Sequence, residues 1–147
     1  MFAELSITSN FTFLTGASHP EEYMERAALL GIEAIAIADD NSVAGIVRAY
    51  TAAKQIARQV AERAALEAAQ GIIGPPRPDH IPAPPSAPVC HVPRLVPAAR
   101  LRFAEGLEVT ALAASRASWA RLCRLISKGR LRAEKGSCDL RLGDLLE

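Results

Sequence analysis

Apolar and polar positions alternate near the N-terminus in a way that predicts two short β-strands. Residues 2–8 alternate between the two kinds, as expected for a strand with one buried face. Residues 32–38 are apolar and β-branched at alternate positions, as in a fully buried strand. Between them lies a helical pattern, with a capping box expected at Ser18 and Glu21 and an end expected at Gly31. The pattern predicts a β-α-β unit with parallel strands.

The hydrophobic pattern of the remaining chain predicts four further elements. An alanine-rich helix is expected over residues 43–70. Residues 94–103 and 107–113 are expected to be strands that flank a turn, and residues 115–128 a helix that ends at Gly129. The buried stripe of this last helix is expected to consist of Trp119, Leu122, Cys123 and Ile126.

A proline-rich segment separates the two groups of elements. Residues 71–97 contain nine of the ten prolines, which favours an extended, partly disordered linker or insertion. We therefore expect a first folded part over residues 1–70 and a second over residues 98–147. Only four strands are predicted, so the sheet is expected to be open and incomplete.

Polar residues directly follow the second predicted strand. Asp39, Asp40, Asn41 and Ser42 lie there, and in barrels built from β-α-β units the chemistry sits at these strand ends. The alternative interpretation is that both aspartates bind backbone amides at the start of the next helix, with Asn41 or Ser42 as its cap. We favour the capping interpretation over a metal role.

Three separated blocks carry a resemblance to a known family. The first comprises residues 4–14 (ELSITSNFTFL) and 16–22 (GASHPEE), and the second comprises residues 36–49 (AIADDNSVAGIVRA). The third comprises residues 119–126 (WARLCRLI) and 132–136 (RAEKG). In this order they resemble the polymerase and histidinol phosphatase (PHP) domain of bacterial C-family DNA polymerases, most of all the error-prone branch.

The resemblance implies a fold and a metal site. Members of the family form an α/β fold, a seven-stranded (β/α) barrel that holds two or three divalent metals and hydrolyses phosphoesters when active. Their first strand carries a His-x-His pair, and here those two positions are Ser6 and Thr8. Asp39 stands at the position of the second-motif aspartate, whereas Arg100 occupies the third-strand motif and would repel a cation. Because hydroxyl groups are weak ligands for such ions, we interpret the metal site as vestigial and expect no cofactor.

The resemblance also implies a function. Our first hypothesis is an N-terminal PHP-like domain of an error-prone DNA polymerase that acts in DNA replication, repair and lesion bypass, with no independent catalysis. The polymerase, a nucleotidyltransferase, would be a longer parent chain, whose remainder would be the main partner. The alternatives are a metal-dependent phosphoesterase using Mn, Zn or Mg, and an inactive gene fragment.

Basic residues gather near the C-terminus. Seven of the twenty residues from 116 to 135 are Lys or Arg. Such a patch can bind nucleic-acid phosphates, and the candidate contacts are Arg121, Arg124, Lys128 and Arg130. The alternatives are a solvated helix face and a surface that packs on the rest of the polymerase. These alternatives agree better with a net charge of only +1 and with the lack of interleaved aromatic residues.

The overall composition is typical of a cytoplasmic protein. The chain has 17 basic and 16 acidic side chains, no run of 18 apolar residues and no signal-peptide pattern, so we expect no membrane partner. Its three cysteines are widely spaced, which does not suggest a disulfide framework. A zinc site made of His80, Cys90 and His91 is a weak alternative, because their spacing matches no common zinc module.

Overall fold

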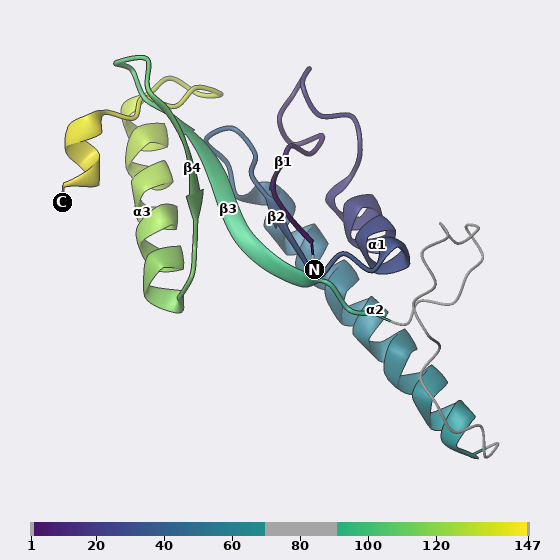
Figure 1. Cartoon of the computed structure of the whole chain (residues 1–147). Coiled ribbons are helices and arrows are strands. Elements are labelled where there is room, and N and C mark those ends of the chain that lie inside the picture. Colours follow the sequence, from purple (N-terminus) through teal and green to yellow (C-terminus); the bar gives the residue numbers. More distant parts are fainter. Residues whose placement is uncertain (1, 70–90, 147) are drawn as a thin grey trace.

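The computed structural model describes residues 2–69 and 91–146, in which strands and helices follow one another much as the hydrophobic pattern predicts. Figure 1 shows their arrangement. In chain order the elements are β1 (Ala3–Ile7), α1 (Pro20–Leu30), β2 (Ala34–Ile37), α2 (Ala44–Ala69), β3 (Arg94–Arg102), β4 (Glu108–Leu112), α3 (Arg116–Arg132) and a short 3-10 helix, η1 (Leu142–Leu145).

The four strands form one sheet in the order β1-β2-β3-β4. The first three strands are parallel, and β4 runs antiparallel to β3, which confirms both the β-α-β unit and the hairpin. The first half of β3, from Arg94 to Pro97, pairs with β2, and its second half, from Ala98 to Arg102, pairs with β4. The long, bent β3 therefore joins the two halves of the molecule (Figure 1).

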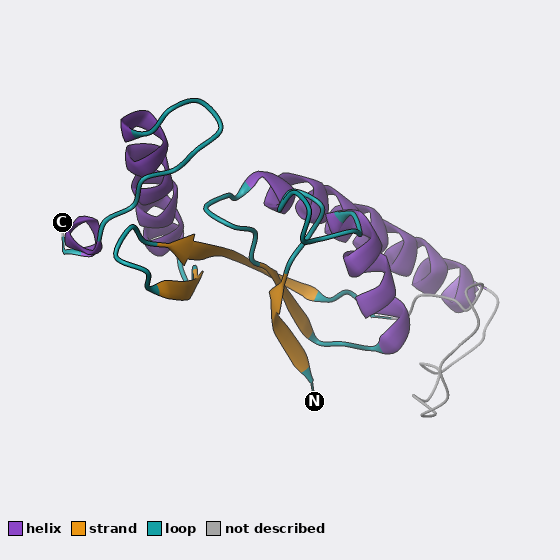
Figure 2. Ribbon diagram, turned by 90° about the horizontal axis from the view of Figure 1, so that it is seen from above, coloured by secondary structure: helices purple, strands orange, loops and turns teal. Residues whose placement is uncertain are grey.

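All three long helices cover the same face of the sheet. Alternate residues of a strand share a face, and Leu95 packs on the core beneath α1 and α2 while Leu101 and Phe103 pack on the core beneath α3. The helices accordingly lie on one side of the strands in Figure 2. The opposite face carries the small buried residues Ala36, Ala38 and Ala98. This curled sheet confirms the predicted fold class, an incomplete α/β barrel of the PHP type.

The start of α1 differs from the prediction by one residue. The helix begins at Pro20 after the cap residue His19, and the Glu22 carboxylate accepts a hydrogen bond of 2.8 Å from the His19 backbone N–H. The predicted capping box at Ser18 and Glu21 is therefore wrong. Gly31 ends the helix as predicted, since its φ of 66° is a left-handed conformation that glycine adopts without steric cost.

The end of α3 also differs from the prediction, because the helix continues through Gly129 to Arg132. A Cβ atom at Gly129 would lie 2.6 Å from Cδ2 of Leu140 and 2.8 Å from Sγ of Cys138. The glycine therefore permits close packing of the C-terminal segment and does not end the helix. In the predicted buried stripe, Leu122 and Ile126 are buried, whereas Trp119 and Cys123 are only half-buried.

The boundary of the proline-rich segment requires a correction as well. A linker that extends to Pro97 is wrong, because residues from Arg94 to Pro97 are paired with β2. Residues 70–90 of this segment lie outside the described residues, so the rest of that prediction stays a prediction. Within the described part of the chain, no helix is long and apolar enough to cross a membrane.

Candidate functional site

A buried carboxylate lies where the chain leaves β1 and β2. The Asp39 side chain, 1% exposed, accepts three hydrogen bonds of 2.8 Å from the loop that follows β1. The donors are the backbone N–H and the hydroxyl of Ser9 and the hydroxyl of Thr12. These three residues, called the Asp39 cluster below, fasten the first loop to the end of β2.

Close backbone approaches enclose the Asp39 cluster on the side of the helices. A Cβ at Gly45, in the first turn of α2, would lie 2.8 Å from Oδ2 of Asp39. A Cβ at Gly16 would lie 2.0 Å from the carbonyl oxygen of Ser9. Only glycine leaves room at these two positions. Asp39 is thus directed toward the helix-covered face, like Ile35 and Ile37 at alternate positions of the same strand.

The opposite face of the sheet carries an arginine between the strand ends. Nη2 of Arg100 donates a hydrogen bond of 2.9 Å to Oγ1 of Thr8. Its Nη1 lies 3.4 Å from Oδ1 of Asp40, and its Nε lies 3.4 Å from Oε1 of Glu108. Arg102 also approaches Asp40 and Glu108, at 2.9 Å and 3.2 Å. Two cationic and two anionic side chains therefore balance one another there.

The backbone fixes the position of Arg100. Its N–H donates to the carbonyl of Asp39 at 3.0 Å, and its carbonyl accepts from the N–H of Asn41 at 2.8 Å. These bonds extend the β2–β3 ladder past the end of β2. The Arg100 side chain, 16% exposed, is consequently held over the residues that follow β1 and β2.

The residues present do not fit a divalent metal. The predicted positions Ser6, Thr8 and Asp39 do not converge, because Ser6 is exposed, Thr8 accepts from a guanidinium, and Asp39 faces the helices. Across residues 2–69 and 91–146, no three His, Cys, Asp or Glu side chains form a group that could hold a metal ion. The cationic Arg100 lies instead between Thr8 and Asp40.

The predicted capping role of the two aspartates is wrong. Asp39 accepts from Ser9 and Thr12, and Asp40 pairs with two arginines of β3, so neither carboxylate binds the start of α2. Ser42, however, accepts from the Ala44 N–H at 3.2 Å, as expected of a cap. Sequence reasoning missed Ser9 and Thr12, although a hydroxyl-rich loop directly after a strand was an available signal.

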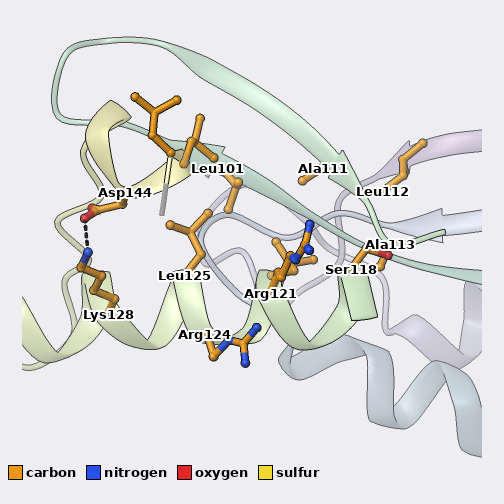
Figure 3. Close-up of a pocket in the computed structure, with 13 residues that line it drawn as sticks. Leu101, Ala111, Leu112, Ala113, Ser118, Arg121, Arg124, Leu125, Lys128 and Asp144 are labelled. Carbon is orange, nitrogen blue, oxygen red and sulfur yellow. Dashed lines mark ion pairs between the residues drawn. The ribbon is translucent and has the colours of Figure 1, made fainter. Parts of the chain in front are cut away.

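The basic residues of α3 divide into two pairs. Arg121 and Arg124 are exposed and line a groove of about 740 Å³ between α3, the β3–β4 hairpin and η1 (Figure 3). Neither has an ion-pair or hydrogen-bond partner in the part of the chain that the structure describes. Lys128 forms an ion pair of 2.9 Å with Asp144, and Arg130 donates to the Asn41 carbonyl at 2.9 Å.

Asp144 organises the C-terminal segment. Its carboxylate accepts two hydrogen bonds from the Arg132 guanidinium, one from the Arg141 backbone N–H, and pairs with Lys128. These groups, called the Asp144 cluster below, hold the pKa of Asp144 well below its usual range, with the Arg132 hydrogen bonds as the largest cause. They attach η1 to α3.

The cysteines offer no activated thiol among the described residues. Cys123 and Cys138 are free, and burial raises the pKa of both thiols, which keeps them protonated at neutral pH. His80 and Cys90 lie outside the described residues, so the zinc alternative stays untested.

Comparison with known proteins gives consistent matches. A family model described as the PHP domain matches residues 4–143. An error-prone DNA polymerase from Ruegeria pomeroyi is 48% identical, over 99% of this chain and 13% of the relative. Another, from Rhodopseudomonas palustris (strain BisB5), is 40% identical, over 98% of this chain and 10% of the relative. The chain thus spans about a tenth of the length of these curated relatives.

A solved structure also resembles the chain. It comes from Bifidobacterium adolescentis and is provisionally described as a metal-dependent phosphoesterase. It is 17% identical, with a TM-score of 0.47, and the match covers 90% of this chain and 35% of that one.

Proposed function

Since the chain belongs to the PHP domain family, we propose that it forms the N-terminal PHP domain of an error-prone DNA polymerase, with a degenerate metal site and no hydrolytic activity of its own. Its parent would be a cytoplasmic nucleotidyltransferase acting in DNA replication, repair and lesion bypass. The remainder of the polymerase chain would then be its main partner.

One observation carries the proposal of a degenerate site. The guanidinium of Arg100 lies between Thr8 and Asp40, at the strand ends where the family resemblance places metal ligands. A divalent ion there would face two guanidinium groups, those of Arg100 and Arg102, at close range. Bound divalent ions require several anionic or imidazole ligands, and the carboxylate of Asp39 is already saturated by Ser9 and Thr12.

A domain exchange tests the assignment to a polymerase. The matching N-terminal region of the Ruegeria pomeroyi relative would be replaced by this chain, and primer extension by the purified chimera would be measured. We expect the chimera to keep most of the relative's activity, because 48% identity predicts the same packing surfaces. A relative lacking this region is the control and should be unstable or inactive. A chimera no better than the deletion would contradict the assignment.

Metal titration tests the alternative, a metal-dependent phosphoesterase. Calorimetry with Mn²⁺ and Zn²⁺ should show no tight binding to the chain, and hydrolysis of a generic phosphoester should not exceed the background rate. Tight binding together with metal-dependent turnover that Asp39→Ala abolishes would instead establish the phosphoesterase.

A second candidate function is DNA contact by α3. We retain Arg121, Arg124, Lys128 and Arg130 as the candidate set, and favour the first two. Exposed arginines without a protein partner are available to phosphates, whereas Lys128 and Arg130 already contact Asp144 and the Asn41 carbonyl.

Anisotropy of labelled single-stranded DNA tests this contact. Arg121→Ala combined with Arg124→Ala should weaken binding at every sequence and reduce the salt slope by roughly one. Arg130→Ala is the matched control, since it removes the same charge at a position already bonded to Asn41. Equal losses in both variants would contradict a specific role for the favoured pair.

A further inference from the structure

The Arg100 side chain contacts residues associated with every other strand of the sheet. Thr8 follows β1, Asp40 follows β2 and Glu108 begins β4, while Arg100 itself belongs to β3. Each of its three guanidinium nitrogens approaches a different oxygen, at 2.9 Å, 3.4 Å and 3.4 Å. The planar fork of an arginine suits three separate acceptors better than the compact charge of a lysine.

Backbone pairing alone does not connect these residues. In the order β1-β2-β3-β4, β1 is hydrogen-bonded to β2 and β4 to β3, so the ladder joins β1 to β4 only through the two strands between them. Thr8 and Arg100 are 92 positions apart in the sequence. The side chain of Arg100 therefore ties one edge of the curled sheet to the other.

The surroundings of Arg100 strengthen this tie. The Arg100 and Asp40 side chains are 16% and 19% exposed, whereas those of Arg102 and Glu108 are about half exposed. Ion pairs that are partly removed from water are screened less than exposed pairs, and breaking one leaves an uncompensated charge. Loss of Arg100 would leave Asp40 paired only with the mobile end of the more exposed Arg102.

We propose that Arg100 is an internal cation that takes the place of a bound metal ion in holding the strand ends together. The oxygens of Thr8, Asp40 and Glu108 form a guanidinium site, which the chain itself fills. Divalent ions are then unnecessary for the stability of the sheet. This inference rests on the proposed function only in treating the metal site as degenerate.

Chemical rescue by free guanidinium tests the proposal. In the full chain, Arg100→Ala should lower the melting temperature by roughly 5 °C and leave a vacant site for a small planar cation. Guanidinium chloride at roughly 10 mM, far below its denaturing range, should recover part of this loss relative to equal sodium chloride. Amide hydrogen exchange at Ala38, whose N–H donates to Ile7 of β1, should accelerate in the variant and slow again with guanidinium.

Arg102→Ala is the matched control, because Arg102 contacts the same two carboxylates but not Thr8. It should melt at a temperature closer to that of the wild type and should not respond to guanidinium. Equal losses in the two variants, or no guanidinium-dependent recovery, would overturn the proposal. Recovery with magnesium chloride but not with guanidinium would overturn it too, since it would show a general requirement for positive charge.

A second variant covers the case in which Arg100→Ala does not fold. Arg100→Lys keeps a charge but cannot reach three acceptors, so its melting temperature should lie below that of the wild type, and a value equal to the wild type would overturn the proposal. None of these measurements depends on the polymerase assignment. A failed domain exchange with successful guanidinium rescue would reject the proposed function and leave the internal cation intact.

Discussion

The Asp39 cluster and the Asp144 cluster use the same kind of side chain in opposite ways. In both, one carboxylate gathers donors from separate segments and fixes a loop. Asp39 is buried and is held by neutral donors, namely two hydroxyl groups and a backbone amide. Asp144 lies near the surface and is held mainly by the cationic side chains of Arg132 and Lys128. The difference shows how burial determines which donors an aspartate needs.

The physical reason is the cost of removing charge from water. A buried carboxylate needs hydrogen bonds that are short, numerous and fixed, since each unmet donor or acceptor costs about 1–3 kcal/mol. At the surface, water replaces a lost partner, so ion pairs there contribute little individually. We therefore expect substitutions in the Asp39 cluster to cost more stability than equivalent substitutions in the Asp144 cluster.

Asp39→Ala should have the largest effect of the substitutions compared here. It leaves the Ser9 amide and the Ser9 and Thr12 hydroxyls without their acceptor inside the protein, and we expect a loss of roughly 3 kcal/mol or more in the free energy of unfolding. Urea denaturation measures this loss. Ser6→Ala, at an exposed position, is the control and should be nearly neutral. A loss for Asp39→Ala no larger than that of the control would contradict the importance of the Asp39 cluster.

Alanine substitutions at two helix glycines sharpen the comparison. At Gly45 the new Cβ would meet the Asp39 carboxylate, which three hydrogen bonds hold in place, so we expect a loss of about 2 kcal/mol. At Gly129 it would meet the ends of the Leu140 and Cys138 side chains, which can rotate away.

The higher helix propensity of alanine also offsets part of the cost at Gly129, so we expect a loss of about 1 kcal/mol or less there. Urea denaturation of both variants in parallel measures the difference. Equal losses at Gly45 and Gly129 would mean that the two regions are packed with similar rigidity.

The sequence predicted those parts of the fold that depend on neighbouring residues. Alternation and helical spacing located the strands and helices, because period-2 and period-3.6 patterns report which face is buried. The end of α3 was missed because Gly129 responds to Leu140 and Cys138, which approach it only in the folded chain. A glycine near a helix end can serve packing or termination, and the local sequence does not distinguish the two.

The candidate site was predictable only in part for the same reason. The resemblance located Thr8, Asp39 and Arg100, but not the faces they occupy. Asp39 bonds to Ser9 across 30 positions, and Arg100 bonds to Thr8 across 92 positions. Such contacts depend on strand order and register, which no local pattern specifies.

Acidification should weaken the Asp144 cluster, with the smallest of these effects. The folded-state pKa of Asp144 is lowered, chiefly by the Arg132 hydrogen bonds, so its contribution to stability is complete above the unfolded pKa of about 3.9. That contribution is lost as the pH falls from this value toward the lower folded-state pKa. The melting temperatures of the wild type and Asp144→Asn should therefore differ at pH 7 and converge below about pH 3.

Asp139→Asn provides the matched control for this convergence. Asp139 forms a single exposed pair of 3.2 Å with Arg141, so its removal should change the melting temperature less at pH 7. High salt should also reduce the Asp144→Asn difference, since the cations that surround Asp144 are near the surface. A difference that persists unchanged at pH 3 and in high salt would show that Asp144 acts through packing, as a buried residue does, and would remove the contrast with Asp39.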